Sequence, residues 1–352
     1  MDHPLTTEEE LDKARTLLHD LEDNPWLNNI FPERISDPRL NVNLDGVHFD
    51  NPVLVGPGWD KMGKLVRIMY QFGFSGVEVG SVLRDPQLGN PKPRFFAKAG
   101  ATLNRFGFNS PGVEIVAKNL DKYKNDSIPT GISIGKNKEI TDARAPEAHA
   151  DVVKILYPYA SYFVINVSSP NTPGLRKLQG KKPLKQIILA VQQAMDGFGK
   201  RKSLYVKIAP DLEKQALDEI IEVAINQKIS GIIASNSTIR SDLKSWYGWR
   251  EEAGGLAGDD PDYRRMVTEQ VAFIRKMAGK KLTIIAAGGV KDTRTALEKL
   301  MAGANAVQIV SAIITDGPMV AQKINQGLIS WMEENGVKNI QEITGIEVKK
   351  NI

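Results

Sequence analysis

The stretch FVINVSSPNTPGLRKLQ, residues 163–179, begins like a buried strand and then turns abruptly polar. Its first residues are β-branched or aromatic, which buried strands favour. The segment SSPNTP then supplies hydroxyls, an amide and two prolines within six residues. Such groups suit hydrogen bonds to a flat polar ligand, and redox chemistry on that ligand would need a cofactor to carry the difficult step.

Similar side chains follow nearly every other short apolar run of the chain. Taken singly, an Asn or Ser after a strand is most often an ordinary turn residue. Together they supply one rim of the predicted fold with hydroxyls, amides and lysines. They are Lys61, Ser81, Ser133, Asn166, Ser168, Ser169, Asn171, Thr172, Lys207, Asn236, Ser237 and Ser311.

Two further features indicate an anionic ligand. Lys207 lies inside an apolar run, where an unpaired ammonium is costly, so it needs an anionic partner that a cofactor could supply. The pair Gly288-Gly289 follows another apolar run and precedes a helical pattern, an arrangement whose backbone N–H groups can approach a phosphate closely. A plain tight turn is the alternative for this glycine pair.

Other kinds of site have less support. The histidines lie outside these motifs, so a Ser–His pair is not indicated, and we expect no metal site because metal ligands are scarce. GWDKMGK, residues 58–64, has the spacing of a phosphate-binding loop but lacks the Ser or Thr that holds magnesium. No GxGxxG follows a predicted strand.

The elements that must position these residues are eight short runs, nearly all apolar and not alternating. Such runs are typical of strands covered on both faces, as in a parallel sheet. They span 53–55, 76–79, 131–134, 163–167, 204–208, 231–234, 282–286 and 306–310.

Helical patterns separate these runs. Two have predicted N-caps: Asp211 before 213–227, and Asp292 before 293–302. The others are 146–157, 184–195, 263–277 and 320–332. Alternating strands and helices favour an α/β fold with a (β/α)8 TIM barrel, and a doubly wound open sheet is the alternative.

Two segments lie outside the bare repeat. Residues 1–45 form a predicted N-terminal helical extension, with an apolar stripe at Leu11, Ala14, Leu18 and Leu21, ahead of a barrel domain spanning 46–352. Residues 81–129 form a long insertion that contains GNPKPRFF and LNRFGFNSPG. Long insertions in compact domains are usually functional or disordered, and these motifs favour function.

Composition narrows the class of protein. The chain has 352 residues, a net charge of +4 and no cysteine. The charge is too small to indicate nucleic acid as a partner, and the lack of cysteine excludes disulfides and thiolate sites. No apolar run is long enough to span a membrane and the N-terminal residues are acidic, so we expect no signal peptide and a cytoplasmic protein.

INVSSPNTPGLRKLQ, VKIAPDL, GNPKPRFF, NRFGFNSPG and GGLAG closely resemble the dihydroorotate dehydrogenase family, in its class 2, quinone-linked form. The resemblance covers roughly residues 46–318 and implies an FMN-containing (β/α)8 barrel. It implies oxidation of dihydroorotate to orotate in pyrimidine (UMP) biosynthesis, with electrons passed to a quinone.

The resemblance also implies roles for individual residues. Ser169 matches the base that removes the C5 proton while C6 passes hydride to flavin N5, and Thr172 matches a proton relay. The prolines of this loop restrict its conformational freedom and so hold the base in place. The substrate-binding positions are Lys61, Asn104, Phe108, Asn166, Asn171, Asn236 and Ser237.

For FMN the resemblance implies a second set of contacts. Lys207 matches a residue near flavin N1, with a catalytic role in stabilising the reduced form. The FMN-binding positions are Gly56, Pro57, Gly58, Lys61, Ser81, Ser133, Asn166, Lys207, Ser235, Gly258, Gly288, Gly289, Val310 and Ser311.

The chain departs from the family pattern mainly on the side of the electron acceptor. Ala97 stands where a second arginine is usual, Val310 where a tyrosine is usual, and Ser133 where an asparagine is usual. The N-terminal residues are strongly acidic, which disfavours anionic lipid, although Trp26, Leu27, Ile30 and Phe31 could still dock on a membrane.

These departures concern the electron acceptor and the cellular location of the protein, and not the oxidation of dihydroorotate. A quinone is expected, together with peripheral contact of residues 1–45 at the inner face of the cell membrane. The alternatives are the same half-reaction with fumarate, NAD or a partner protein as acceptor, or a lyase that forms a Schiff base on Lys207 or Lys61.

Overall fold

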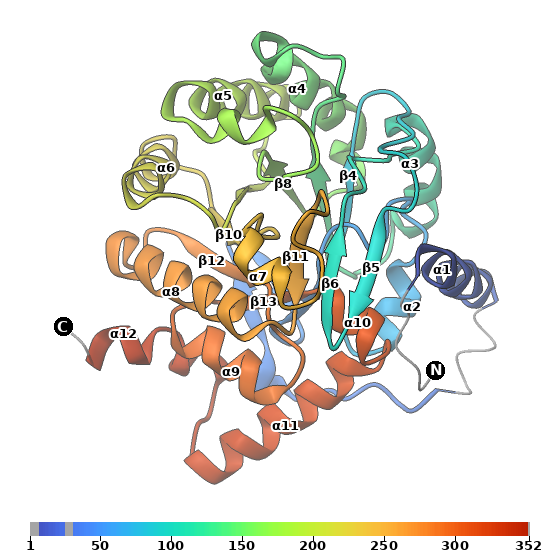
Figure 1. Cartoon of the computed structure of the whole chain (residues 1–352). Helices are drawn as coiled ribbons and strands as arrows, with labels where there is room; N and C mark the ends of the chain where they lie inside the picture. Colours follow the sequence, from blue (N-terminus) through green and yellow to red (C-terminus); the bar gives the residue numbers. More distant parts are fainter. Residues whose placement is uncertain (1–6, 25–30, 351–352) are drawn as a thin grey trace.

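The computed structural model describes residues 7–24 and 31–350, and its centre is a closed barrel of eight parallel strands (Figure 1). Each strand pairs with two neighbours, and β10 joins β9 to β12 to complete the ring. The predicted TIM barrel is therefore confirmed, and the open sheet is wrong. The barrel strands are β3 (Val53–Val55), β4 (Val77–Val82), β7 (Thr130–Ile134), β8 (Tyr162–Asn166), β9 (Ser203–Ile208), β10 (Gly231–Ala234), β12 (Thr283–Ala287) and β13 (Ala306–Ile309).

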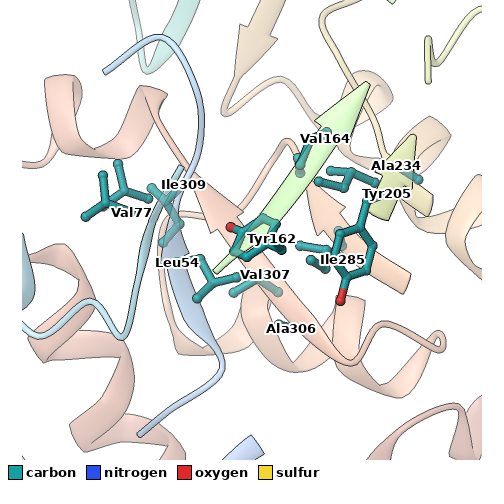
Figure 2. Close-up of a cluster of buried hydrophobic side chains, with 14 of the residues drawn as sticks. Leu54, Val77, Tyr162, Val164, Tyr205, Ala234, Ile285, Ala306, Val307 and Ile309 are labelled. Carbon is teal, nitrogen blue, oxygen red and sulfur yellow. The ribbon is translucent and has the colours of Figure 1, made fainter. Parts of the chain in front are cut away.

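The barrel interior explains why the strands are apolar without alternation. Each strand is covered by helices outside and by packed side chains inside, so both faces leave water. Figure 2 shows Tyr162 and Tyr205 lying in the packed centre of the barrel with Leu54 and Ile285. These residues are at most 1% exposed, which makes the interior a packed core and not a pore.

Helices follow the strands in the predicted alternation and surround the barrel. They are α2 (Val66–Gln71), α3 (Val113–Leu120), α4 (Ala145–Leu156), α5 (Lys181–Asp196), α6 (Lys214–Asn226), α8 (Pro261–Ala278), α9 (Thr293–Met301) and α11 (Val320–Asn335), with α12 (Ile346–Lys350) near the C-terminus. Short 3-10 turns span Pro38–Leu40, Asp121–Tyr123, Asp142–Arg144, Tyr157–Tyr159, Leu175–Gln179 and Ile340–Ile343.

Only one of the two predicted N-caps is correct. Asp292 caps α9, where its carboxylate accepts a 2.8 Å hydrogen bond from the Thr295 amide. Asp211 does not cap α6, because that helix begins later and has Glu213 at its N-cap without a side-chain bond. Asp211 instead pairs with Arg176 at 2.7 Å, so an interaction distant in sequence replaces the local one.

The N-terminal segment contains the predicted helix, α1 (Glu8–Asp23), and the predicted apolar stripe is its buried face. Phe31 packs on Phe72, with ring centroids 4.9 Å apart, and is not free to dock elsewhere. Trp26, Leu27 and Ile30 lie outside the described residues. The strands β1 (Val42–Leu44) and β2 (Val47–Phe49) form a hairpin whose turn contains the predicted domain boundary at 45/46, and that boundary stays a prediction.

The insertion after β4 is ordered. It contributes β5 (Phe95–Lys98) and β6 (Ala101–Asn104), and β6 pairs with both β5 and β11 (Gly255–Gly258) in an antiparallel sheet at the carboxyl ends of the barrel strands. Two short helices, α7 (Ser241–Ser245) and α10 (Ser311–Thr315), lie near this sheet (Figure 1). The insertion therefore forms part of the wall around the barrel rim.

The capping difference predicts a difference in stability. Asp292→Ala should lower the free energy of unfolding by about 1 kcal/mol, because the first turn of α9 loses an acceptor. Glu213→Ala is the matched control and should be nearly neutral, since this N-cap side chain makes no capping bond. Urea unfolding of both variants measures the two values, and equal losses would contradict the prediction.

Candidate active site

A cavity opens at the carboxyl ends of the barrel strands, between the barrel and the β5–β6–β11 sheet. Nearly all the residues singled out from the sequence meet there, although they come from every part of the chain. Those that line it are Gly56, Pro57, Gly58, Lys61, Ser81, Asn104, Phe108, Asn166, Ser169, Asn171, Lys207, Ser235, Asn236, Ser237, Gly258, Gly288, Gly289, Val310 and Ser311.

Two of the predicted site residues do not line this cavity. Ser133 is fully buried behind Ser81, and the two hydroxyl oxygens are 2.9 Å apart. Thr172 is also buried, and its Oγ1 has no hydrogen-bond partner among the described residues. Ser133 thus contacts the cavity through Ser81. Thr172 lies in the same loop as Ser169, and its hydroxyl is available for a further hydrogen bond.

The end of β8 fixes the position of Ser169. The Asn166 amide donates to Ser81 Oγ at 2.8 Å, and its oxygen accepts from Ser168 Oγ at 3.0 Å. Ser169 is 6% exposed, and its hydroxyl accepts a 3.3 Å hydrogen bond from the backbone N–H of Asn171. No described histidine or carboxylate contacts this hydroxyl, so any proton that it accepts must leave through the ligand, water or a neighbouring hydroxyl.

Arg176 clamps this loop to two other parts of the rim. Its guanidinium donates to the Ser168 carbonyl at 2.9 Å, to the Ser237 carbonyl at 2.8 Å and to the Asp211 carboxylate at 2.7 Å. A planar donor set can satisfy three acceptors in fixed directions, which a lysine cannot do. The loops after β8, β9 and β10 are therefore held in one relative position.

Lys61 is a partly buried cation on the wall of the cavity. Its Nζ donates to Asn109 Oδ1 and lies 4.1 Å from the centroid of the Phe106 ring. Burial, followed by the positive charges of Arg15 and Arg94, holds the pKa of Lys61 well below its usual value. An anionic group in the cavity would relieve this penalty.

Lys207 is a second buried cation, at the floor of the cavity and 5% exposed. Its Nζ donates to Gln308 Oε1 at 3.2 Å. Burial lowers the pKa of Lys207, and the charge of Glu78 opposes that effect. The floor therefore presents a positive charge that has no carboxylate in direct contact.

The far end of the cavity suits an anion such as phosphate. Gly288 and Gly289 follow β12 with φ of +119° and +71°, and their amides donate no hydrogen bond within the described residues. A Cβ on Gly288 would lie 2.3 Å from the Tyr263 hydroxyl, so a side chain does not fit there. Free amides beside the Ser311 hydroxyl provide donors for a bound oxyanion.

Several cavity residues were missed from the sequence. Leu11 and Arg15 come from α1, Gln308 from β13 and Asn109 from the insertion. Arg15 donates to the Gly58 carbonyl at 2.6 Å, and its Nε has no partner among the described residues. Its spacing of four from Leu11 places both on one helix face, which is the signal that could have identified it.

The comparisons with known proteins agree with this arrangement. The family model described as dihydroorotate dehydrogenase matches residues 39–332. The chain belongs to the dihydroorotate dehydrogenase family. A relative from Nostoc punctiforme named dihydroorotate dehydrogenase (quinone) is 39% identical over 338 residues, covering 92% of this chain and 89% of the relative.

Other members of the family are similarly related. A Thermus thermophilus protein of the same name is 37% identical over 317 residues, covering 88% of each chain. The crystal structure of an Eimeria tenella dihydroorotate dehydrogenase in complex with ferulenol superposes with a TM-score of 0.88 at 33% identity, covering 96% of this chain and 95% of the other. The resemblance deduced from the motifs is therefore confirmed over most of the chain.

The departures from the family pattern can now be placed in the structure. Ala97 lies on β5 and does not line the cavity, whereas Val310 does. The cavity arginine comes instead from α1, as Arg15. Arg15 on α1 thus places a guanidinium in the cavity wall. The strand β5, where the family pattern has an arginine, has Ala97 instead.

The Arg176 clamp predicts a stability effect. Arg176→Lys should lower the free energy of unfolding by about 2–4 kcal/mol, because lysine keeps the charge but cannot reach three fixed acceptors. Arg201→Lys, at an exposed pair with Asp196, is the control and should change it by less than about 0.5 kcal/mol. Similar unfolding midpoints for the two variants in urea would show that the clamp contributes little.

Proposed function

We propose that this chain oxidises dihydroorotate to orotate in pyrimidine biosynthesis and passes the electrons to a quinone. The observation that carries the proposal is the convergence of Ser169, Lys61 and the amides of Asn104, Asn166 and Asn171 around one cavity. In a member of this family, that set matches a small ring with a carboxylate and several polar edges. The neighbouring glycine end provides room for a second, anionic group.

The donor set of the cavity fits FMN. Its phosphate would be held by the amides of Gly288 and Gly289 and the hydroxyl of Ser311, while Gly56, Pro57 and Gly58 would pack near the ring. Ser81, Asn166, Ser235, Gly258, Lys61 and Val310 would complete the contacts, with Ser133 acting through Ser81. When bound, FMN supplies the hydride acceptor, which no side chain can provide.

The remaining residues hold the substrate and remove its proton. Lys61 would pair with the carboxylate, while Asn104, Asn166, Asn171, Asn236 and Ser237 would hydrogen-bond the ring edges and Phe108 would pack against it. Ser169 would accept the C5 proton and Thr172 would relay it, since its Oγ1 has no other partner among the described residues. Lys207 would stabilise negative charge that forms at the floor during the reaction.

The acceptor side of the cavity is apolar apart from one cation. Leu11, Phe95, Val310 and Ile314 line it together with Arg15. An apolar wall with a single guanidinium suits a quinone head group, which is flat and carries carbonyl oxygens that accept hydrogen bonds. The relatives named as quinone-dependent enzymes support the same acceptor.

Peripheral contact with a membrane through residues 1–45 remains part of the proposal. Among the described residues, no helix has the length and apolar character needed to cross a bilayer. The first turn of α1 carries Glu8, Glu9 and Glu10, so contact with anionic lipid would have to rely on apolar residues. A quinone that is itself dissolved in lipid is the reason to expect such contact.

One anaerobic experiment tests the proposal. The purified protein should be yellow, should bleach with dihydroorotate, and should regain its colour with a short-chain quinone but not with fumarate or NAD. Ser169→Ala should bleach about 10²–10⁴-fold more slowly, because it lacks the proton acceptor. Recovery of colour with fumarate or NAD would change the acceptor, and a colourless protein that borohydride traps on Lys61 or Lys207 would favour the Schiff-base lyase.

The low pKa of Lys61 predicts how ligand affinity depends on pH. A carboxylate favours the charged lysine, so orotate should bind most tightly below the pKa of Lys61 in the free protein. Affinity should fall as the pH rises through the interval between the free and the bound pKa. Titration of orotate across pH measures this, and Lys61→Met should bind weakly without that dependence.

A further inference from the structure

Three polar side chains form a hydrogen-bonded chain across the barrel interior, and its inner end is not used by the proposed reaction. Lys207 Nζ donates to Gln308 Oε1 at 3.2 Å, and Gln308 Nε2 donates to Glu78 Oε2. The three residues belong to β9, β13 and β4, which are not neighbours in the barrel. The chain therefore crosses the interior from the cavity floor to a carboxylate beneath it.

Glu78 is fully buried, is connected to the cavity through Gln308 and Lys207, and is incompletely paired. It is 0% exposed, it does not line the cavity, and its Oε1 has no partner among the described residues. Its register partner on β7 is Gly131, where a Cβ would lie 2.5 Å or less from the ring and hydroxyl of Tyr162. The Tyr162 hydroxyl also has no hydrogen-bond partner among the described residues, so two unpaired polar groups lie in the same part of the core.

The charges around Glu78 are few. The strands that pair with β4, which are β3 and β7, carry no charged residue. The titratable groups that interact with Glu78 from across the barrel are Lys207 and Tyr162, and burial keeps the pKa of Tyr162 well above its usual value. Lys207 and Glu78 thus form a buried pair, joined through Gln308, whose net charge is zero when both are ionised.

This pair responds to any negative charge added at the cavity floor. An anion beside Lys207 leaves the buried region with one excess negative charge, which is costly in a medium of low dielectric constant. Burial already raises the pKa of Glu78 to about 7, although Lys207 and Gln308 oppose the shift. Protonation of Glu78 is consequently the least costly way for this region to return to neutrality.

We propose that Glu78 takes up a proton from solvent when negative charge forms beside Lys207, and releases it when that charge leaves. The inference rests on the proposed binding of FMN above Lys207. Reduction of the cofactor would bring two electrons and one proton to the cavity, and Glu78 would bind a second proton from solution. On reoxidation the acceptor would take the two electrons, and both protons would be released. Glu78 touches neither cofactor nor substrate and acts through Gln308 and Lys207, so it is a positioning residue.

The size and direction of the effect follow from electrostatics. A unit charge about 10 Å away, at an effective dielectric constant of about 20, raises the pKa of a carboxyl group by about one unit. Extra proton uptake should therefore reach about half a proton per protein slightly above pH 7, between the pKa values of the oxidised and reduced states. It should vanish well below and well above that interval.

The test counts protons during photoreduction of the FMN-loaded protein, followed with an indicator dye in weakly buffered anaerobic solution. A tertiary amine supplies the two electrons in place of dihydroorotate, and photoreduction of free FMN with the same amine gives the number of protons released by the donor, which is subtracted. The native protein should show the extra uptake as a peak against pH. Glu78→Gln should lose the peak because it keeps a hydrogen-bond acceptor for Gln308 but cannot titrate, whereas Glu78→Asp and Tyr162→Phe should retain a peak.

The outcomes separate this inference from the proposed function. A peak that persists in folded Glu78→Gln, checked by its melting temperature, would assign the proton to another group and overturn the inference. If that variant does not fold, infrared difference spectra of the native protein decide, since reduction should produce a protonated carboxyl band. A normal peak in a protein that dihydroorotate does not reduce would contradict the proposed function alone, and failure to bind FMN would overturn both.

Discussion

Closure of the barrel is the constraint on which the rest of the structure depends. Each strand is three to six residues long, and a strand of that length is stable here because it pairs on both sides in a continuous ladder. Closure also forces all the carboxyl ends onto one rim, so Asn166, Lys207 and Gly288 become neighbours despite their distance in sequence. The chemistry of the site is a consequence of this geometry, because each loop need only place one or two groups at its own strand end.

Two groups of buried or partly buried charges around the cavity have different partners. Glu8 with Arg94, and Arg176 with Asp211, are paired ions that hold segments together and gain from fixed geometry. Lys61 and Lys207 face the cavity with amide oxygens or a ring for partners, and Arg15 donates to the Gly58 carbonyl and lies 3.7 Å from the Asp12 carboxylate. An anion in the cavity would offset the cost of burying these charges, and the depressed pKa of Lys61 expresses the same cost.

The sequence was informative wherever local rules determine structure. All eight strands, six of the helices and the buried stripe of α1 were predictable, since burial of short apolar runs and helical periodicity are local patterns, whereas α2 and α3 were not predicted. Asp211 was misread because its proximity to a helix start suggested a cap, while Arg176 on another loop offered a charged partner with better geometry. Gln308 and the buried position of Ser133 could not be derived from local pattern, since each depends on which strands meet across the barrel.

The position of α1 shows how such long-range contacts change the interpretation of a segment. Glu8 accepts hydrogen bonds from the Arg94 backbone and side chain at 2.8 Å, and Glu22 accepts from the Ile68 amide at 2.7 Å near the start of α2. Between these anchors, Leu11 and Arg15 face the cavity. The acidic residues that disfavour anionic lipid are thus partly those that fasten the helix to the barrel. The helix is a wall of the cavity and contributes the Arg15 guanidinium to it, whereas β5 contributes the ring of Phe95.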